Sequence, residues 1–182
     1  MKVKKRKWII SVSAALLVMI LFFTGYSRIN REYPETDLVI VNKGESLSYT
    51  NNLELSVQSS EFMTDNWKKE YSYIPDPQKC EVIHVVLNAD NHSNEDATLD
   101  LTNLYIQTNG FSTAIQAEIG ASVNPDESEL MVVIPAEGER NLDLYYELDS
   151  IAFTSAQWKN IRKSQFWISC REYYPERQRM LL

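Results

Sequence analysis

The sequence predicts a mainly β protein, in which an N-terminal transmembrane helix precedes an antiparallel β-sandwich with one short helix near residues 155–163. Three observations lead to this fold class. A charge-free apolar run follows a basic cluster at the N-terminus. About eight short segments then show the period-two alternation of half-buried strands, with a turn every ten or so residues. One segment near the C-terminus carries helix start and stop signals instead.

The N-terminal segment predicts both a membrane anchor and its orientation. Five basic residues open the chain: Lys2, Lys4, Lys5, Arg6 and Lys7. Residues 8–26 then form a charge-free run of nineteen, about the helix length that spans a roughly 30 Å hydrocarbon core. Because flanking basic residues stay on the cytoplasmic side, the rest of the chain is expected to face outward. A cleaved export signal, which shares the basic start but has a shorter apolar run, is one alternative. A buried helix of a soluble protein is the other, although it leaves the basic start unexplained.

The expected organisation is a cytoplasmic basic head at 1–7, a transmembrane signal anchor at 8–26, a stalk at 27–37 and an extracytoplasmic β-sandwich at 38–182. The expected location is the cell membrane, with a single pass and the lipid bilayer as a partner through residues 8–26. The residues after the anchor include 25 acidic and 13 basic side chains, a net charge of −12. Such a surface repels nucleic acid, so no nucleic-acid partner is expected.

Short strands are expected at 38–41, 46–50, 53–59, 81–88, 98–107, 111–119, 130–134, 142–148 and 166–170. Asn51-Asn52 and Asn109-Gly110 are typical of tight hairpin turns, since both residue types tolerate a positive φ. Apolar residues occupy both faces of 81–88, which predicts a central, covered strand. The alternation within 98–107 changes phase near Asn103, which predicts a β-bulge.

The one predicted helix runs from about 155 to 163. Thr154 can cap its first turn while Gln157 reaches back to the backbone of Thr154, the arrangement called a capping box. Phe153 and Trp158 have the spacing of the accompanying hydrophobic staple. Basic residues near its C-terminal end favour the helix dipole.

Segment 60–79 interrupts the alternation and is expected to be a long loop with room for one helical turn. It carries four aromatic residues among charged ones: Phe62, Trp67, Tyr71 and Tyr73. Loops of this length are uncommon in compact domains and are often functional. The aromatic residues are interpreted either as anchors that pin the loop to the sandwich or as a lip that binds a partner.

Two cysteines, Cys80 and Cys170, lie in the part of the chain that is expected outside the cytoplasm. An even count there permits a disulfide between them, provided that their strands are neighbours or face each other across the core. Two buried thiols are the alternative, because cysteine is a common core residue. In a strand, Cys80 and His84 would lie about 13 Å apart, too far for a catalytic thiolate–imidazole pair.

No catalytic residue, cofactor or metal site is predicted. The five glycines lack the spacing of a phosphate-binding loop or a nucleophile elbow. The two histidines, His84 and His92, have no partners at metal-ligand spacing, and His84 is expected in a strand with a satisfied ring. The turn at 90–96 lacks the central glycine and the distal glutamate of a calcium-binding loop.

Several turns and strands carry a resemblance that covers about residues 38–182. They are Gly44-Glu45, the Asn51-Asn52 turn, 82–88, Leu104-Tyr105, 136–139 and a closing strand at 169–175 with its Tyr-Pro-Glu. In these features the chain resembles immunoglobulin-like domains of unknown function from small anchored or lipidated exported proteins of Gram-positive bacteria. The resemblance implies an immunoglobulin-like fold and an envelope location, and it implies no activity. The lipidated cysteine of many such proteins is absent, and the 8–26 segment stands in its place.

These features together predict a non-enzymatic extracytoplasmic binding or accessory module, whose partner is an unknown envelope protein or ligand. The alternative is an accessory or regulatory subunit of a membrane transporter or sensor complex, in which the anchor also makes contacts. A cell-envelope hydrolase fits the sequence less well, because no constellation of residues supports it.

Overall fold

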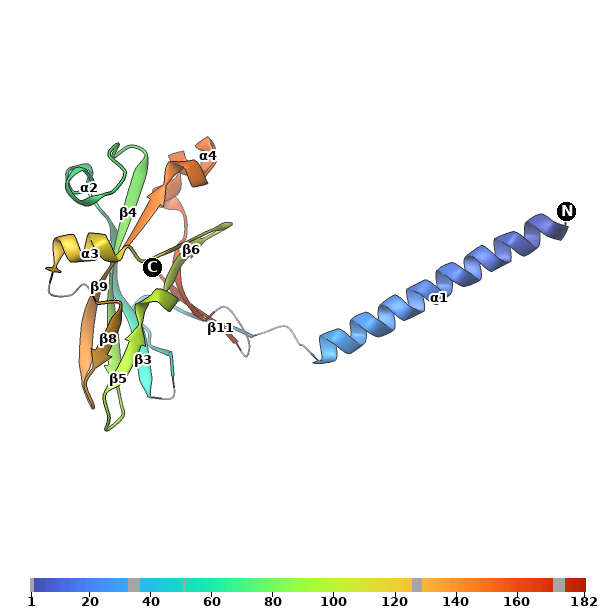
Figure 1. The fold of residues 1–182 in the computed structure, drawn as a ribbon, viewed down its shortest axis with the longest axis horizontal. Helices are drawn as coiled ribbons and strands as arrows, with labels where there is room; N and C mark the ends of the chain where they lie inside the picture. The colour runs from blue at the N-terminus through green and yellow to red at the C-terminus, as the bar shows by residue number, and fades with distance from the viewer. Residues whose placement is uncertain (1, 33–36, 51, 126–128, 172–175) are drawn as a thin grey trace. The chain divides into compact units, whose positions relative to one another are not determined.

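The computed structural model describes residues 2–32, 37–50, 52–125, 129–171 and 176–182, with the backbone alone for residues 2–15, Arg171 and Glu176. The chain divides into two units, residues 1–37 and 38–182, and each is considered by itself. The smaller unit contains helix α1 (Lys2–Glu32), and the larger unit is built mainly of β-strands in two packed sheets (Figure 1). The predicted β-sandwich is therefore confirmed.

Helix α1 corrects the transmembrane prediction. Among the residues that the structure describes, no helix is long and apolar enough to cross a membrane. The signal anchor predicted at 8–26 is therefore wrong, and so is the single-pass location with a cytoplasmic N-terminus and an extracytoplasmic domain that depended on it. The physical reason is that the strongly apolar run, 8–23, rises over only about 24 Å as a helix. Thr24, Gly25 and Tyr26 complete the charge-free run without adding comparable hydrophobicity.

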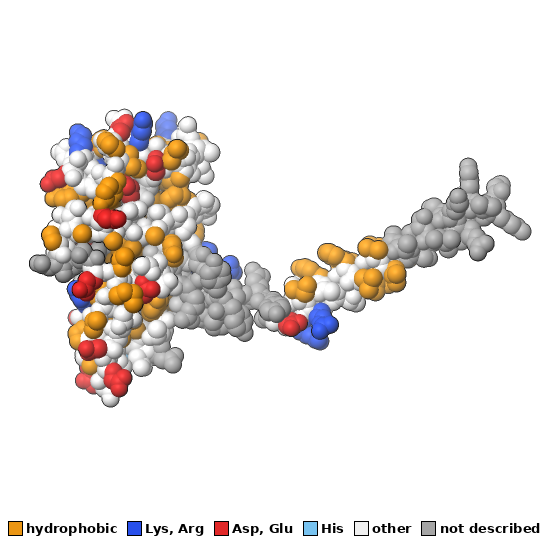
Figure 2. Space-filling view, viewed as in Figure 1, with side chains coloured by type: hydrophobic (Ala, Val, Ile, Leu, Met, Phe, Trp, Pro, Cys, Tyr) orange, Lys and Arg blue, Asp and Glu red, His pale blue; other side chains and the backbone are white. Residues whose placement is uncertain are grey.

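The helix also continues through residues 27–32, which the sequence assigned to the stalk. Its described apolar side chains, from Leu16 to Ile29, are each 50–65% exposed, and Figure 2 shows them along the helix. Helix α1 includes the basic residues that were predicted to set the topology, Lys2, Lys4, Lys5, Arg6 and Lys7. Only their backbone is described.

Two main sheets form the sandwich. The five-stranded sheet has the order β1 (Asp37–Val41), β11 (Glu176–Leu181), β10 (Trp167–Arg171), β6 (Tyr105–Thr108) and β7 (Phe111–Ala114). The four-stranded sheet has the order β2 (Leu47–Ser48), β3 (Leu53–Phe62), β4 (Cys80–Asn91) and β9 (Glu139–Asp149). A separate pair joins β5 (Ala97–Asp100) and β8 (Met131–Ile134). Strand β4 pairs antiparallel with β3 on one side and with β9 on the other. It is therefore the central strand that the sequence predicted.

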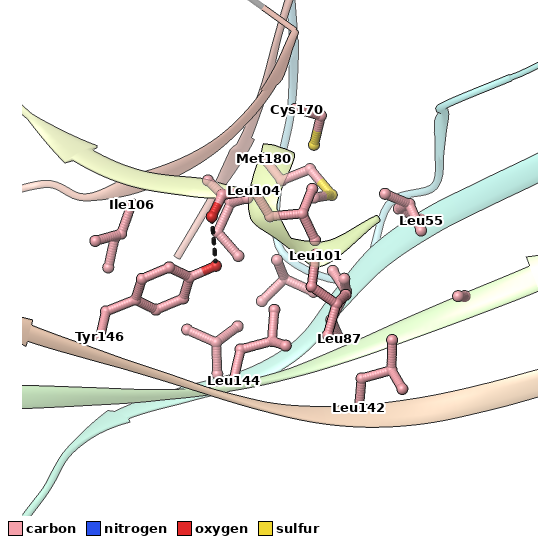
Figure 3. Packing of buried hydrophobic residues seen from close by; sticks show 14 of the residues in the cluster. Leu55, Leu87, Leu101, Leu104, Ile106, Leu142, Leu144, Tyr146, Cys170 and Met180 are labelled. Atoms are coloured by element: carbon pink, nitrogen blue, oxygen red, sulfur yellow. Dashed lines mark hydrogen bonds between the residues drawn. The ribbon is translucent and has the colours of Figure 1, made fainter. Parts of the chain in front are cut away.

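The main core lies between the sheets and is made of side chains that alternate inward along each strand. Leu55, Leu87 and Leu144 come from the four-stranded sheet, and they meet Ile106 and Met180 from the five-stranded sheet (Figure 3). Such alternation is the expected consequence of a strand with one face buried.

The one tyrosine hydroxyl in this core is satisfied. Tyr146 is fully buried, and its hydroxyl donates a hydrogen bond to the carbonyl oxygen of Leu104 at 3.3 Å. Burial raises the pKa of Tyr146 far above its usual value, so this hydroxyl stays protonated and remains a donor. The bond therefore links β9 to the start of β6 through the core.

The predicted β-bulge near Asn103 is a change of sheet. Strand β5 ends at Asp100, a 3₁₀ turn η1 (Leu101–Asn103) follows, and β6 then begins in the five-stranded sheet. The side chain of Asp100 accepts from the backbone N–H of Thr102 at 2.9 Å and starts this turn. The change of phase in the alternation thus marks the point where the chain leaves the β5–β8 pair and enters the five-stranded sheet.

The helix predicted at 155–163 is confirmed over its first part, and a 3₁₀ turn takes the place of its last part. Helix α4 (Ser155–Lys159) begins with the predicted capping box between Thr154 and Gln157, and the rings of Phe153 and Trp158 are 5.8 Å apart. Two 3₁₀ turns flank it, η3 (Ser150–Ala152) and η4 (Ile161–Lys163).

Helix α3 (Ala117–Val123) occupies residues that were expected to end the 111–119 strand. Two alanines favour a helix there. Helix α3 contacts β9, and its Ile119 is fully buried beside Val82 and Tyr145. At the C-terminus, β10 ends at Arg171, β11 follows as a strand that the sequence did not separate, and 172–175 lie outside the described residues.

Candidate functional site

The segment predicted as a functional loop contains a short helix, α2 (Asp65–Tyr71). Thr64 caps it, because its hydroxyl oxygen accepts from the backbone N–H of Trp67 at 3.3 Å. Asp65 lies in its first turn and Lys68 in its last turn, the charge order that the helix dipole favours. Figure 1 shows α2 and α3 on the same side of the sandwich, and contacts join α2 to β4 and α3 to β9.

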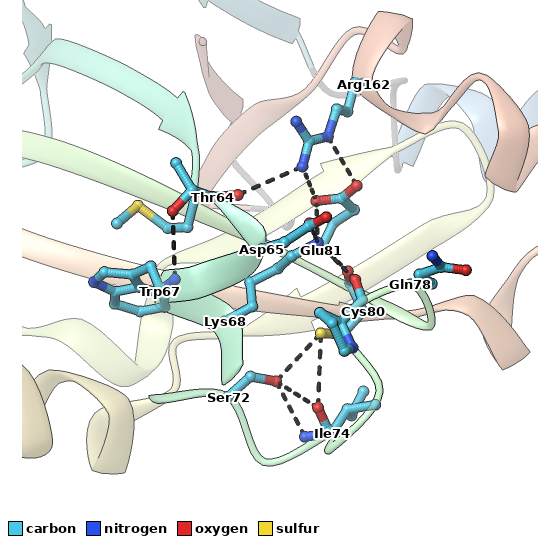
Figure 4. Close-up of polar contacts among 12 residues, drawn as sticks. Thr64, Asp65, Trp67, Lys68, Ser72, Ile74, Gln78, Cys80, Glu81 and Arg162 are labelled. Atoms are coloured by element: carbon cyan, nitrogen blue, oxygen red, sulfur yellow. Dashed lines mark hydrogen bonds and ion pairs between the residues drawn. The ribbon is translucent and has the colours of Figure 1, made fainter. Parts of the chain in front are cut away.

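Lys68 holds this segment to the sheet from within. Its side chain is 1% exposed, and its ammonium group donates to the carbonyl oxygens of Pro77 at 2.7 Å and Cys80 at 2.9 Å. It also pairs with Glu81 Oε2 at 3.2 Å and Asp65 Oδ1 at 3.0 Å (Figure 4). A buried ammonium group costs several kcal/mol unless it is paired and hydrogen-bonded, and here every donor has an oxygen acceptor. Helix α2, the turn after it and the start of β4 are therefore fixed by one cation.

Glu81 links this cation to a second one. Arg162, in η4, forms two hydrogen bonds to the Glu81 carboxylate, from Nε to Oε1 and from Nη2 to Oε2, both at 2.8 Å. This fork raises the pKa of Arg162, so the guanidinium stays charged. The same guanidinium lies 5.5 Å above the ring of Phe62. Two segments about 80 residues apart in sequence are joined by this ion pair.

A hollow of about 550 Å³ opens beside α2. Its walls include the four charged residues Asp65, Lys68, Glu81 and Arg162, together with Thr64, Asn66, Pro77 and Gln78. We call it the α2 hollow. The Lys68 ammonium, by hydrogen bonding and by attraction, holds the pKa of the Asp65 carboxyl below its usual value. The charges of the two cations and the two carboxylates therefore balance. The hollow presents paired charges and two side-chain amides, and neither positive nor negative charge dominates.

A second, smaller core lies under α2 and α3. Val82, Ile119 and Tyr145 are buried there, and Trp67 and Tyr71 pack against them. The ring of Trp67 lies 5.0 Å from that of Tyr71 and stacks on Tyr145 at 5.4 Å.

The stack continues along the sheet to His84, whose ring lies 4.8 Å from Tyr145 because the two residues are directly paired between β4 and β9. His84 Nε2 is 2.6 Å from Asp143 Oδ1, and Nδ1 is 3.7 Å from Glu61 Oε1. Tyr145 was not predicted from the sequence, although its position two residues after Asp143 in an alternating strand places both side chains on the same face.

The four predicted aromatic residues do not form one platform. The structure brings Trp67 and Tyr71 together, and it places Phe62 elsewhere, in contact with the main core and with its ring 6.0 Å from Phe166. Tyr73 is 58% exposed. Three of the four therefore serve as anchors for packing, and Tyr73 is the exposed member.

The two cysteines are both buried thiols, and no disulfide joins these described residues. Cys80 begins β4 of the four-stranded sheet, whereas Cys170 lies in β10 of the five-stranded sheet. Burial raises the pKa of the Cys80 thiol, and the Ser72 hydroxyl lies 3.3 Å from its sulfur. Ser72 also donates to Glu147 Oε1. Because only the thiolate is a good nucleophile, a raised pKa makes the Cys80 thiol less reactive than an ordinary cysteine.

Metal-ligating residues do not converge in the described part of the chain, where no three side chains of His, Cys, Asp or Glu are grouped to hold an ion. His92 lies 3.7 Å from Glu54 Oε2 and 3.8 Å from Asp90 Oδ1. Asn91, the last residue of β4, is fully buried, and its amide donates to the backbone carbonyl of Glu95 in the turn that follows, at 2.8 Å. This turn is fixed by its own side chains.

Comparison with known proteins gives a family and three structural likenesses. The family model described as "Domain of unknown function (DUF5028)" matches residues 31–178. No curated protein matches the sequence. Among solved structures, an uncharacterized β-sandwich protein from Clostridium difficile is similar, with 12% identity and a TM-score of 0.47, over 81% of this chain and 96% of that one.

A putative lipoprotein from Bacillus subtilis has 10% identity and a TM-score of 0.48, over 75% of this chain and 38% of the other. A functionally unknown protein from Listeria monocytogenes has 15% identity and a TM-score of 0.47, over 70% and 72%. The immunoglobulin-like strand order that the resemblance implied stays a prediction.

Proposed function

The chain belongs to the DUF5028 family, and we propose that it is a non-enzymatic binding module whose α2 hollow recognises a protein partner. The observation that carries this proposal is the buried Lys68 ammonium, which fixes α2 and the turn after it against β4 through four oxygen acceptors. A loop that is already ordered loses little conformational entropy when it binds, so its exposed groups can contribute to affinity.

The surface that the loop presents fits a protein partner better than a small apolar ligand. Its hollow carries paired charges and the amides of Asn66 and Gln78, and Tyr73 is exposed nearby in sequence. Interfaces of non-obligate complexes combine such a polar rim with aromatic and arginine side chains. The hollow has no dominant charge, which favours a partner of mixed polarity over a strongly basic or acidic one.

A matched pair of asparagine substitutions tests this proposal. Asn66 lies in the wall of the α2 hollow, and Asn94 lies in the turn after β4; both are exposed. In the full-length protein, Asn66→Arg should abolish the recovery of specific crosslinked partners from the native cells, because the new side chain adds bulk and an unbalanced positive charge to the wall of the hollow. Asn94→Arg makes the same change in charge and size elsewhere, and it should leave recovery unchanged.

Thermal unfolding of both variants checks that each is folded. The same proteins recovered at the same yield with Asn66→Arg would overturn the assignment of the α2 hollow. A turnover activity that is lost when a single carboxylate is replaced in a folded variant would overturn the non-enzymatic part of the proposal.

A further inference from the structure

A second hollow lies on the five-stranded sheet, away from the sheet that carries α2. It measures about 400 Å³, and its walls come from β6, β10, β11 and the turn between β6 and β7. That turn is tight, because Thr108 pairs with Phe111 across Asn109 and Gly110, and Gly110 has a φ of 79°. The turn therefore holds one wall of the hollow in a fixed position.

Arg179 and Trp167 form the opposite wall. The guanidinium carbon of Arg179 lies 4.5 Å from the centre of the Trp167 ring system, a cation–π contact. A cation–π contact uses the charge of the guanidinium and leaves its N–H groups available as hydrogen-bond donors. Among the side chains that the structure describes, no carboxylate forms an ion pair with Arg179, although residues 38–182 contain 22 acidic and 11 basic residues.

Gln107 adds a second donor. The indole N–H of Trp167 donates to Gln107 Oε1 at 2.9 Å, which fixes the orientation of the amide. The amide nitrogen is then directed to the Ser112 hydroxyl at 3.5 Å, the long limit of a hydrogen bond. None of the residues that line this hollow is acidic. The hollow therefore carries the positive charge of Arg179, the Gln107 amide, whose only described hydrogen bond as a donor is long, and the Ser112 hydroxyl.

We propose that this hollow is a binding site for an oxyanion, a carboxylate or a phosphate, attached to a flat apolar body. The guanidinium fork of Arg179 would bind two oxygens of the anion, and Gln107 and Ser112 would donate to it from the other side. The rings of Trp167 and Phe111 supply the apolar contact. The inference goes beyond the proposed α2 site, since it concerns a different sheet and a different ligand class.

Small probes are titrated into the full-length, ¹⁵N-labelled protein, and the NMR signal of the Trp167 indole N–H is followed. Benzoate is expected to shift this signal to saturation with a dissociation constant on the order of millimolar. Benzamide has the same shape without the charge and should bind at least about tenfold more weakly. Phenyl phosphate distinguishes a phosphate from a carboxylate as the preferred group, and tighter binding of either anion supports the proposal.

Variants show whether Arg179 and Gln107 bind the anion. Arg179→Gln should weaken anion binding about tenfold, whereas Arg140→Gln, the same change on β9, should not. Gln107→Glu keeps the acceptor for the Trp167 indole but places a negative charge in the hollow, so it should abolish binding in a protein that is still folded. Saturable binding that is unchanged in Arg179→Gln and Gln107→Glu would overturn the site, as would no binding of either anion at tens of millimolar.

Discussion

Arg162 and Arg179 each lie over an aromatic ring, yet their charges are used differently. Arg162 stands 5.5 Å above Phe62 and gives two N–H groups to Glu81 at 2.8 Å. Arg179 stands 4.5 Å above Trp167, and no described carboxylate pairs with it. The first arginine belongs to a balanced set of charges, whereas the second, which is half-buried, has no carboxylate partner among the described side chains.

Whether a described carboxylate pairs with it, rather than its contact with an aromatic ring, decides the role of each arginine in this molecule. Arg162 connects η4 to β4 through a carboxylate that also holds the buried Lys68. Its removal should therefore appear as lost stability. Arg179 makes no such connection between distant segments, so its removal should appear as lost binding with little change in stability.

The largest effect is expected when the carboxylate shared by Lys68 and Arg162 is removed. Glu81→Gln leaves the 1%-exposed Lys68 with Asp65, which is 63% exposed, as its remaining counterion. An undercompensated buried charge of this kind should lower the free energy of unfolding by about 3 kcal/mol. Denaturant-induced unfolding of the full-length protein measures this loss.

Glu61→Gln is the matched control, because Glu61 is 71% exposed and lies on the neighbouring strand. Its effect should stay within about 0.5 kcal/mol. Equal losses in the two variants would show that the network around Lys68 is not the main contributor at this site.

The two arginines can then be compared directly by the same substitution. Arg162→Gln should cost about 1.5 kcal/mol, since it removes a bidentate ion pair that is only half exposed to solvent. Arg179→Gln should cost about 0.5 kcal/mol, the low end of the range for a cation–π contact that is not fully desolvated. Chemical unfolding of both variants under identical conditions provides the measurement. A larger loss for Arg179→Gln would reverse the roles assigned to the two residues.

Sequence patterns predicted the strands best where one face of a strand is buried, as in β3 and β4. The alternation around Leu55 and the apolar faces of the strand that contains His84 depend on local composition alone. The capping box of Thr154 and Gln157 is also local, and it was found where it was predicted. The phase change near Asn103 was detected, but its meaning depends on which strand lies opposite, and a single segment carries no information about that.

The two sites depend on contacts between segments, which the sequence pattern does not contain. Lys68 would be placed at the surface by composition, since lysine is rarely buried without partners. Its burial requires carbonyl oxygens of Pro77 and Cys80 that only the folded turn brings to it. Trp167 and Arg179 meet because β10 pairs with β11 in one register. A shift of that register by one residue would place Arg179 on the other face.

The membrane prediction failed for a different reason. A count of charge-free residues treats Thr24 and Gly25 as equal to leucine, although they contribute little to transfer into hydrocarbon. The helix itself was local and predictable and is present as α1, but no helix among the described residues is long and apolar enough to cross a membrane.

The smallest expected effect is the pH dependence that Asp65 gives to the Lys68 network. The hydrogen bond and attraction from Lys68 lower the pKa of Asp65 in the folded state below its ordinary value of 3.8. A lowered pKa stabilises the fold above the unfolded value, and this contribution is lost as the pH falls through the folded value. The stability difference between wild type and Asp65→Asn should therefore be constant near neutral pH and shrink below about pH 4.

Chemical unfolding across this acidic range tests the prediction, and the Arg179 variant provides the contrast. Because no described carboxylate pairs with Arg179, the stability difference between wild type and Arg179→Gln should be nearly independent of pH over the same range. If the Asp65→Asn difference were equally flat, the lowered pKa of Asp65 would have no part in holding α2. If the Arg179→Gln difference shrank in acid instead, Arg179 would have a carboxylate partner in solution, and the contrast between the two arginines would fail.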